Sequence, residues 1–167
     1  MNIEEVAALA VDCGLQVHRE LGPGLLESVY ETVLSAMLAK RGLTVERQKP
    51  ISFVCDDLMF TNAFRVDLLI ESSLIVEVKS VESLAKVHGK QLLTYLRLSD
   101  LRLGLLMNFG AATFREGLRQ IVNNHMDFAS SRLRVHQTSV AKPDWDSFFD
   151  RGPNLDFPTL EEIRGTK

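Results

Sequence analysis

The sequence has little cysteine, no excess of positive charge and no long apolar run, and each lack argues against a class of protein. Its two cysteines, Cys13 and Cys55, have no CxxC spacing, which argues against a zinc or iron–sulfur site and indicates reduced thiols in a core. A formal net charge of −3 argues against a generically basic nucleic-acid coat, although a local basic groove stays open. Because no run reaches spanning length and Glu4 and Glu5 replace a basic leader, we expect no membrane association and a cytoplasmic protein.

Several catalytic signatures are also missing. The chain contains no GxxxxGK[ST] loop, no GxSxG elbow and no HExxH pair, so kinase, hydrolase-elbow and zincin functions are set aside. What the 167 residues do have is 46% hydrophobic content, which is enough for one domain with a real core.

Hydrophobic periodicity predicts an α/β protein. Apolar residues at helical spacing indicate helices over about 3–21, 26–40 and 84–98. Alternating or continuous apolar runs indicate strands over about 44–55, 60–70, 74–81 and 101–109. The first three strands should form an antiparallel meander, and the fourth should pair parallel to the third through a right-handed helical crossover. Residues 113–123 fit either a strand or a helix, and a strand is favoured for their first half.

The composition changes after about residue 125. Three of the five prolines and the only tryptophan fall in the last quarter, together with phenylalanines that are too many for a purely disordered tail. We therefore expect a domain over residues 1–125 and an irregular extension over 126–167. The extension would pack on the domain or face a partner, including a second copy of the chain.

A predicted β-hairpin brings opposed carboxylates together. If its loop is Glu71 to Ser73, counting outward places Asp67 opposite Glu77 and Arg65 opposite Lys79, all on one face. Two opposed carboxylates repel each other, and a divalent cation between them would relieve the repulsion. Oxygen ligands of this kind suit Mg²⁺ or Mn²⁺, with Lys79 beside the metal. The alternative is an ordinary solvated hairpin face.

Two helix faces carry further candidates. His88, Gln91 and Tyr95 are spaced three and four residues apart, so they share one side of a helix and could hydrogen-bond a phosphate or base edge. The alternative is a half-buried tyrosine beside two surface residues. Glu27 and Tyr30 lie in the first turn of the second helix, where a glutamate can simply complement the helix dipole, an effect of roughly 0.3 to 1 kcal/mol.

Taken together, these motifs resemble a known family. Gly24 to Tyr30 matches a GxxExxY signature. It is followed in order by Arg65-Val66-Asp67, Glu77-Val78-Lys79, His88 with Gln91 to Tyr95, and Asn108-Phe109-Gly110. The chain resembles the GxxExxY proteins of the PD-(D/E)XK nuclease-like superfamily over about residues 3–123.

The resemblance implies a fold and a site. The fold is a restriction-endonuclease-like core of order αβββαβ, a mixed sheet flanked by helices, here preceded by an extra N-terminal helix. The site is Mg²⁺ (or Mn²⁺) held by Asp67, Glu77 and the Val78 carbonyl, with Lys79 as a catalytic residue. Glu27 takes the acidic role of the first core helix and is a candidate for a further metal ligand. Gln91 and Tyr95 correspond to a QxxxY element.

The expectation from residues and resemblance together is a Mg²⁺-dependent nuclease acting on DNA, or with lower preference on RNA. Its catalytic residues would be Glu27, Asp67, Glu77 and Lys79, and its substrate contacts would come from Tyr30, Arg65, His88, Gln91 and Tyr95. The alternatives are a catalytically silent nucleic-acid-binding module and a protein-interaction module that uses the extension.

Overall fold

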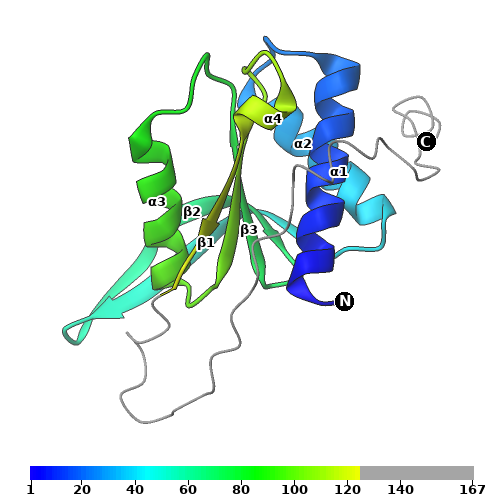
Figure 1. Cartoon of the computed structure of the whole chain (residues 1–167). Coiled ribbons are helices and arrows are strands. Elements are labelled where there is room, and N and C mark those ends of the chain that lie inside the picture. The colour runs from blue at the N-terminus through cyan, green and yellow to red at the C-terminus, as the bar shows by residue number, and fades with distance from the viewer. Residues whose placement is uncertain (125–167) are drawn as a thin grey trace.

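A mixed five-stranded sheet forms the centre of the protein, whose computed structural model describes residues 1–124 (Figure 1). The strands follow the order β1-β2-β3-β4-β5 across the sheet. They are β1 (Val45–Cys55), β2 (Leu58–Ile70), β3 (Leu74–Lys79), β4 (Leu103–Asn108) and β5 (Leu118–Val122). The helices are α1 (Ile3–Leu21), α2 (Glu27–Lys40), α3 (Lys86–Leu98) and α4 (Phe114–Gly117). The predicted core order and the extra N-terminal helix are both confirmed.

The pairing of strands also matches the prediction. β2 and β3 are antiparallel, with Ile70 opposite Leu74. β3 and β4 pair in parallel and are connected in sequence through α3. β4 is buried along its whole length, as expected of a strand covered on both faces. The carboxyl ends of β3 and β4 therefore meet at one edge of the sheet, where Lys79 pairs with Asn108.

Helices cover the two faces of the sheet unequally. α1 and α2 pack on one face and bury the larger cluster, which includes Leu68, Val76 and Val78, while α3 packs on the other face over Leu69 and Ile75 (Figure 1). The sequence sets the ends of α1 directly. Its Asn2 side chain accepts from the Glu5 amide in a capping box, and Gly22 ends the helix with φ of 66°.

The β1–β2 hairpin is irregular at Gln48, which has φ of 48°. Beyond this point Val66 packs with the cluster under α3 and not with Leu68, so the strict alternation predicted for β2 is wrong across Asp67. Phe64 packs on the same side as Val66, which places the intervening Arg65 on the opposite face. Arg65 therefore does not share a face with Asp67 and Glu77.

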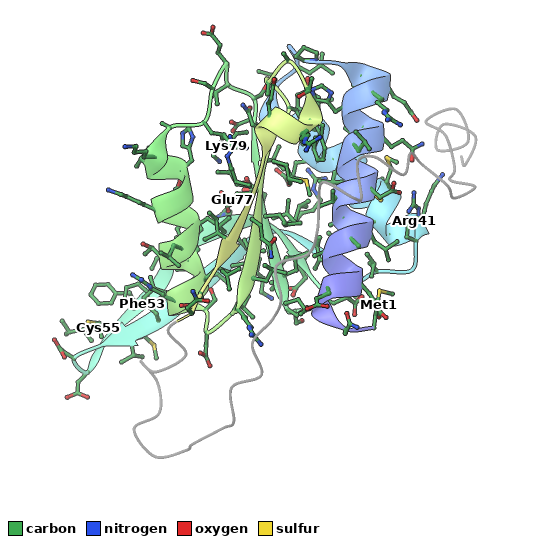
Figure 2. All side chains as sticks on the ribbon, in the orientation of Figure 1. Met1, Arg41, Phe53, Cys55, Glu77 and Lys79 are labelled. Atoms are coloured by element: carbon green, nitrogen blue, oxygen red, sulfur yellow. The ribbon has the colours of Figure 1, made fainter. Side chains whose placement is uncertain are left out.

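The far end of this hairpin extends beyond the other strands of the sheet, with Phe53 and Cys55 well separated from Glu77 and Lys79 (Figure 2). Cys55 is exposed there, so only Cys13 is the buried thiol that the sequence predicts for both cysteines. Burial raises the pKa of the Cys13 thiol to about 11.

Residues 113–123 differ from the prediction in their first half. Thr113 accepts from the Glu116 amide and caps the short helix α4, and the strand β5 begins only at Leu118. The predicted extension over 126–167 lies outside the described residues.

Candidate metal and active site

Asp67 and Glu77 lie where the β2–β3 ladder stops. The last ladder pair is Leu68 with Val76, and beyond it each carboxylate accepts from the opposite backbone. Asp67 Oδ2 accepts from the Val78 amide at 2.9 Å, and Glu77 Oε1 accepts from the Asp67 amide at 3.4 Å. Side-chain hydrogen bonds therefore replace the regular ladder here, and the two carboxylates lie close together just beyond its last pair.

Lys79 brings a positive charge to the same point. Its Nζ lies 3.1 Å from the Val78 carbonyl oxygen, 3.5 Å from Glu77 Oε2 and 3.9 Å from Asp67 Oδ2. Figure 2 shows Glu77 and Lys79 on the same strand, β3. Three oxygens from three residues thus converge on one cationic nitrogen.

Burial makes Glu77 costly to ionise. The residue is 4% exposed, and this desolvation raises its pKa to about 7, with the neighbouring Asp67 charge adding to the effect. Lys79 and the Asp67 amide act in the opposite direction but do not offset the burial. The site therefore holds a carboxylate that a further cation would stabilise in its charged form.

Glu27 reaches this end of the sheet from α2. Its Oε1 accepts from the Ser80 amide at 3.1 Å, and the Ser80 hydroxyl donates to the Leu25 carbonyl at 2.7 Å. These bonds join the start of α2 to the residue that follows Lys79. The Glu27 carboxylate is thus bonded to Ser80, the residue next to Lys79 of the charged cluster.

Tyr30 has a structural role in place of the predicted substrate contact. It has no exposed surface, and its ring stacks on Phe109 with centroids 4.6 Å apart. Its hydroxyl donates to the Gly22 carbonyl and accepts from the Leu25 amide. Tyr30 therefore fixes the loop that carries Glu27.

Sequence reasoning missed Glu31 and Gln48. Glu31 is 5% exposed and accepts from Arg47 Nε at 2.9 Å and from Gln48 Nε2 at 2.7 Å. The same Gln48 amide nitrogen lies 3.1 Å from Asp67 Oδ1. The spacing of Glu31 one helical turn after Glu27 was a usable signal, since residues four apart share a helix face. Nothing in the sequence marked Gln48.

The predicted α3 face is partly assembled. Gln91 Nε2 donates to the Tyr95 hydroxyl at 2.7 Å, and the Tyr95 ring stacks on Phe64 of β2 at 4.2 Å. Gln91 is exposed and Tyr95 half-buried. His88 uses Nδ1 to accept from the Ala85 amide, so it caps its own helix. Arg65 is exposed on the other side of β2 and stands apart from this group.

The family model of the PD-(D/E)XK nuclease superfamily matches residues 4–121. The chain belongs to this superfamily. The matched range contains both carboxylates, Lys79 and the α3 face, and the mixed sheet with flanking helices is that of a restriction-endonuclease-like PD-(D/E)XK fold. Comparison with curated proteins and with solved structures gives no match. Along residues 1–124, none of the helices is both long and apolar enough to cross a membrane.

The residues of this PD-(D/E)XK protein fit a hard divalent cation with few protein ligands. No group of three or more His, Cys, Asp or Glu side chains placed to hold a metal occurs within residues 1–124, so Glu27 does not complete a carboxylate triad there. The donors available are two carboxylates and the Val78 carbonyl, already gathered around the Lys79 ammonium. Mg²⁺ is commonly bound by one or two carboxylates and keeps several waters, so this donor set suits it.

Proposed function

We propose that the protein is a Mg²⁺- or Mn²⁺-dependent nuclease that hydrolyses phosphodiester bonds, with DNA preferred over RNA, and that it belongs to the GxxExxY group. The observation that carries the proposal is the convergence of Asp67, Glu77 and the Val78 carbonyl on Lys79 Nζ, all within 3.9 Å. Membership of a nuclease superfamily supports a nucleic-acid substrate.

Each residue of the proposed site would have a separate role. Asp67, Glu77 and the Val78 carbonyl would hold the ion, which when bound supplies Lewis-acid polarisation and a more acidic water. Lys79 contributes positive charge beside the phosphoryl oxygens, where negative charge grows during attack. Glu27, fixed at the Ser80 amide, adds a carboxylate at the rim.

Gln91 and Tyr95 offer polar groups to the substrate strand. Gln91 is exposed and keeps its amide oxygen for a base edge or sugar, while the stacking of Tyr95 on Phe64 holds its hydroxyl in place. His88 and Arg65 stay in the proposal as more peripheral substrate contacts. A cytoplasmic location and a partner or second subunit bound through residues 126–167 complete the proposal.

The test is cleavage of single- and double-stranded substrates with and without Mg²⁺. Asp67→Ala and Lys79→Ala should each lower the rate by about 10²–10³-fold, the usual cost of losing one group that stabilises transition-state charge. Lys49→Ala, which removes a lysine paired with Glu46, is the matched control and should keep the wild-type rate. Equal traces of activity in all four proteins would mean contamination and refute the nuclease proposal.

A second candidate is a nucleic-acid-binding module without turnover. The observation that favours it is the absence of a third carboxylate from the cluster among residues 1–124. In that case binding should be salt-dependent, survive Glu77→Ala and proceed without cleavage. Cleavage that requires Glu77 would exclude this candidate.

A further inference from the structure

Gln48 has a backbone conformation that is unusual for its position. Its φ of 48° lies in the left-handed region, yet it stands inside β1 between the ladder pairs Arg47–Leu68 and Lys49–Val66. For a residue with a side chain this conformation costs roughly 1–2 kcal/mol and persists only where the surroundings enforce it. Most other residues with positive φ lie in turns, namely Asp56, Asp57, Glu71, Ser72 and Asp100.

The strained backbone lets two consecutive side chains meet one carboxylate. In a regular strand, neighbouring side chains point to opposite faces. Here Arg47 Nε and Gln48 Nε2 both donate to Glu31, at 2.9 and 2.7 Å. The left-handed conformation at Gln48 brings its amide back toward α2. In the paired strand β2, the change of face between Leu68 and Val66 occurs directly across from Gln48.

The Gln48 amide connects Glu31 to Asp67. An amide nitrogen carries two hydrogens, and here it has two carboxylate acceptors, Glu31 Oε2 and Asp67 Oδ1. Asp67 Oδ2 is bound separately by the Val78 amide. Both oxygens of Asp67 are thus anchored, one to β3 and one through Gln48 to α2, so the plane of the carboxylate is fixed.

We infer that Gln48 is a positioning residue for the metal ligand Asp67, an inference that rests on the proposed metal site. Gln48 orients the carboxylate, and Glu31, whose charge Arg47 balances, orients Gln48. In this strained conformation of β1 the Gln48 amide lies between the two carboxylates. Partners of this kind typically contribute 10–100-fold to metal affinity, or about that much to activity.

The test is Gln48→Gly, which removes the amide and relaxes the backbone at the same time. Because glycine accepts positive φ, the strain relieved offsets the loss of the two amide hydrogen bonds, and the midpoint of chemical unfolding should stay close to the wild-type value. The affinity for Mg²⁺, measured by calorimetry, should nevertheless fall about 10–100-fold. In the metal-free protein, hydrogen exchange of the Val78 amide should become faster, since the carboxylate that accepts from it is less well held.

Asn62→Gly is the matched control. Asn62 also has positive φ, 50°, within β2, so the substitution gives a smaller backbone relief of the same kind, since asparagine tolerates this region better, at a position remote in the ladder from Asp67. It should leave Mg²⁺ affinity and Val78 exchange at wild-type values. Wild-type affinity and exchange in Gln48→Gly would overturn the inference.

The same measurements separate this inference from the proposed function. If the wild-type protein binds no Mg²⁺, the metal-dependent function fails. Faster Val78 exchange in Gln48→Gly but not in Asn62→Gly would still show that Gln48 orients Asp67. Unchanged exchange in both variants would show that it does not.

Discussion

Glu77 is the residue at which the needs of the proposed site oppose those of the fold. Its carboxylate is buried beside Asp67, and Lys79 at 3.5 Å compensates only part of the cost of ionising it. Functional sites commonly retain such unfavourable groups at the expense of stability. The metal-free protein should therefore lose stability when Glu77 ionises.

The stability of the metal-free protein should fall as pH rises through the range in which Glu77 ionises. Burial raises its pKa from 4.5 to about 7, so between these values the folded protein binds a proton that the unfolded chain has released. Stability is therefore highest below this range and lower above it. Glu77→Gln removes this dependence and should exceed the wild type by about 2–3 kcal/mol near pH 8, with little difference near pH 4.

Chemical denaturation in the presence of a chelator, at both pH values, measures this difference. Glu82→Gln, which changes an exposed glutamate in the loop after β3, is the control and should leave the pH dependence unchanged. A stability advantage of Glu77→Gln that is equal at low and high pH would contradict the ionisation argument.

At the scale of elements, two helical glycines have opposite surroundings. A Cβ at Gly14 of α1 would lie 2.5 Å from a ring carbon of Phe114 and 3.0 Å from the Met107 sulfur, whereas a Cβ at Gly89 of α3 would meet only Ile121 at 3.6 Å. The close approach at Gly14 lets α1 pack against β4 and α4. Gly89 has no such role.

Alanine at the two positions should therefore change stability in opposite directions. Gly14→Ala should destabilise by about 1–3 kcal/mol because buried atoms must move. Gly89→Ala should stabilise by up to about 1 kcal/mol, the usual gain in helix propensity. Denaturant midpoints of the two variants and the wild type test this, and a gain in stability for Gly14→Ala would show that the α1 contact is not tight.

Local sequence patterns were sufficient to predict most helices and strands. They were insufficient where tertiary contacts determine the secondary structure. Periodicity predicts α1, α3 and the register of the β2–β3 hairpin, because those patterns are set by which face is buried. The first half of 113–123 was assigned wrongly, although Thr113 and Glu116 form the T-x-x-E spacing of a capping box. The local capping signal for a helix was therefore present in the sequence.

The two carboxylates of the candidate site could be predicted from the sequence, but the residues that hydrogen-bond to them from β1 and α2 could not. Asp67, Glu77 and Lys79 follow from counting along one hairpin. The roles of Gln48 and Glu31 depend on the contact between α2 and β1. The left-handed conformation at Gln48 could not be predicted locally, because no glycine or asparagine marks it in the sequence. The prediction for Tyr30 is wrong because the signature that contains it combines a proposed site residue, Glu27, with a core residue.

At the scale of the whole molecule, metal binding should raise the free energy of unfolding. The site couples β2, β3 and α2 through Asp67, Glu77 and the Gln48 bridge, so an ion bound there stabilises the folded chain and not the unfolded one. A ligand at about 100 times its Kd adds about 2.7 kcal/mol to the free energy of unfolding. The gain should be largest for the wild type above about pH 7, where Glu77 is ionised and metal and proton no longer compete.

Thermal unfolding of the full chain over a series of Mg²⁺ concentrations tests this. The wild-type Tm should rise with Mg²⁺, and Asp67→Asn should abolish most of the rise, because the amide keeps the size of the side chain but loses the charge that binds the ion. Glu82→Gln should behave like the wild type, and NaCl at matched ionic strength separates specific binding from screening. An equal rise in wild type and Asp67→Asn would place the ion elsewhere on the protein, and the hairpin carboxylates would then lose their assignment as its ligands.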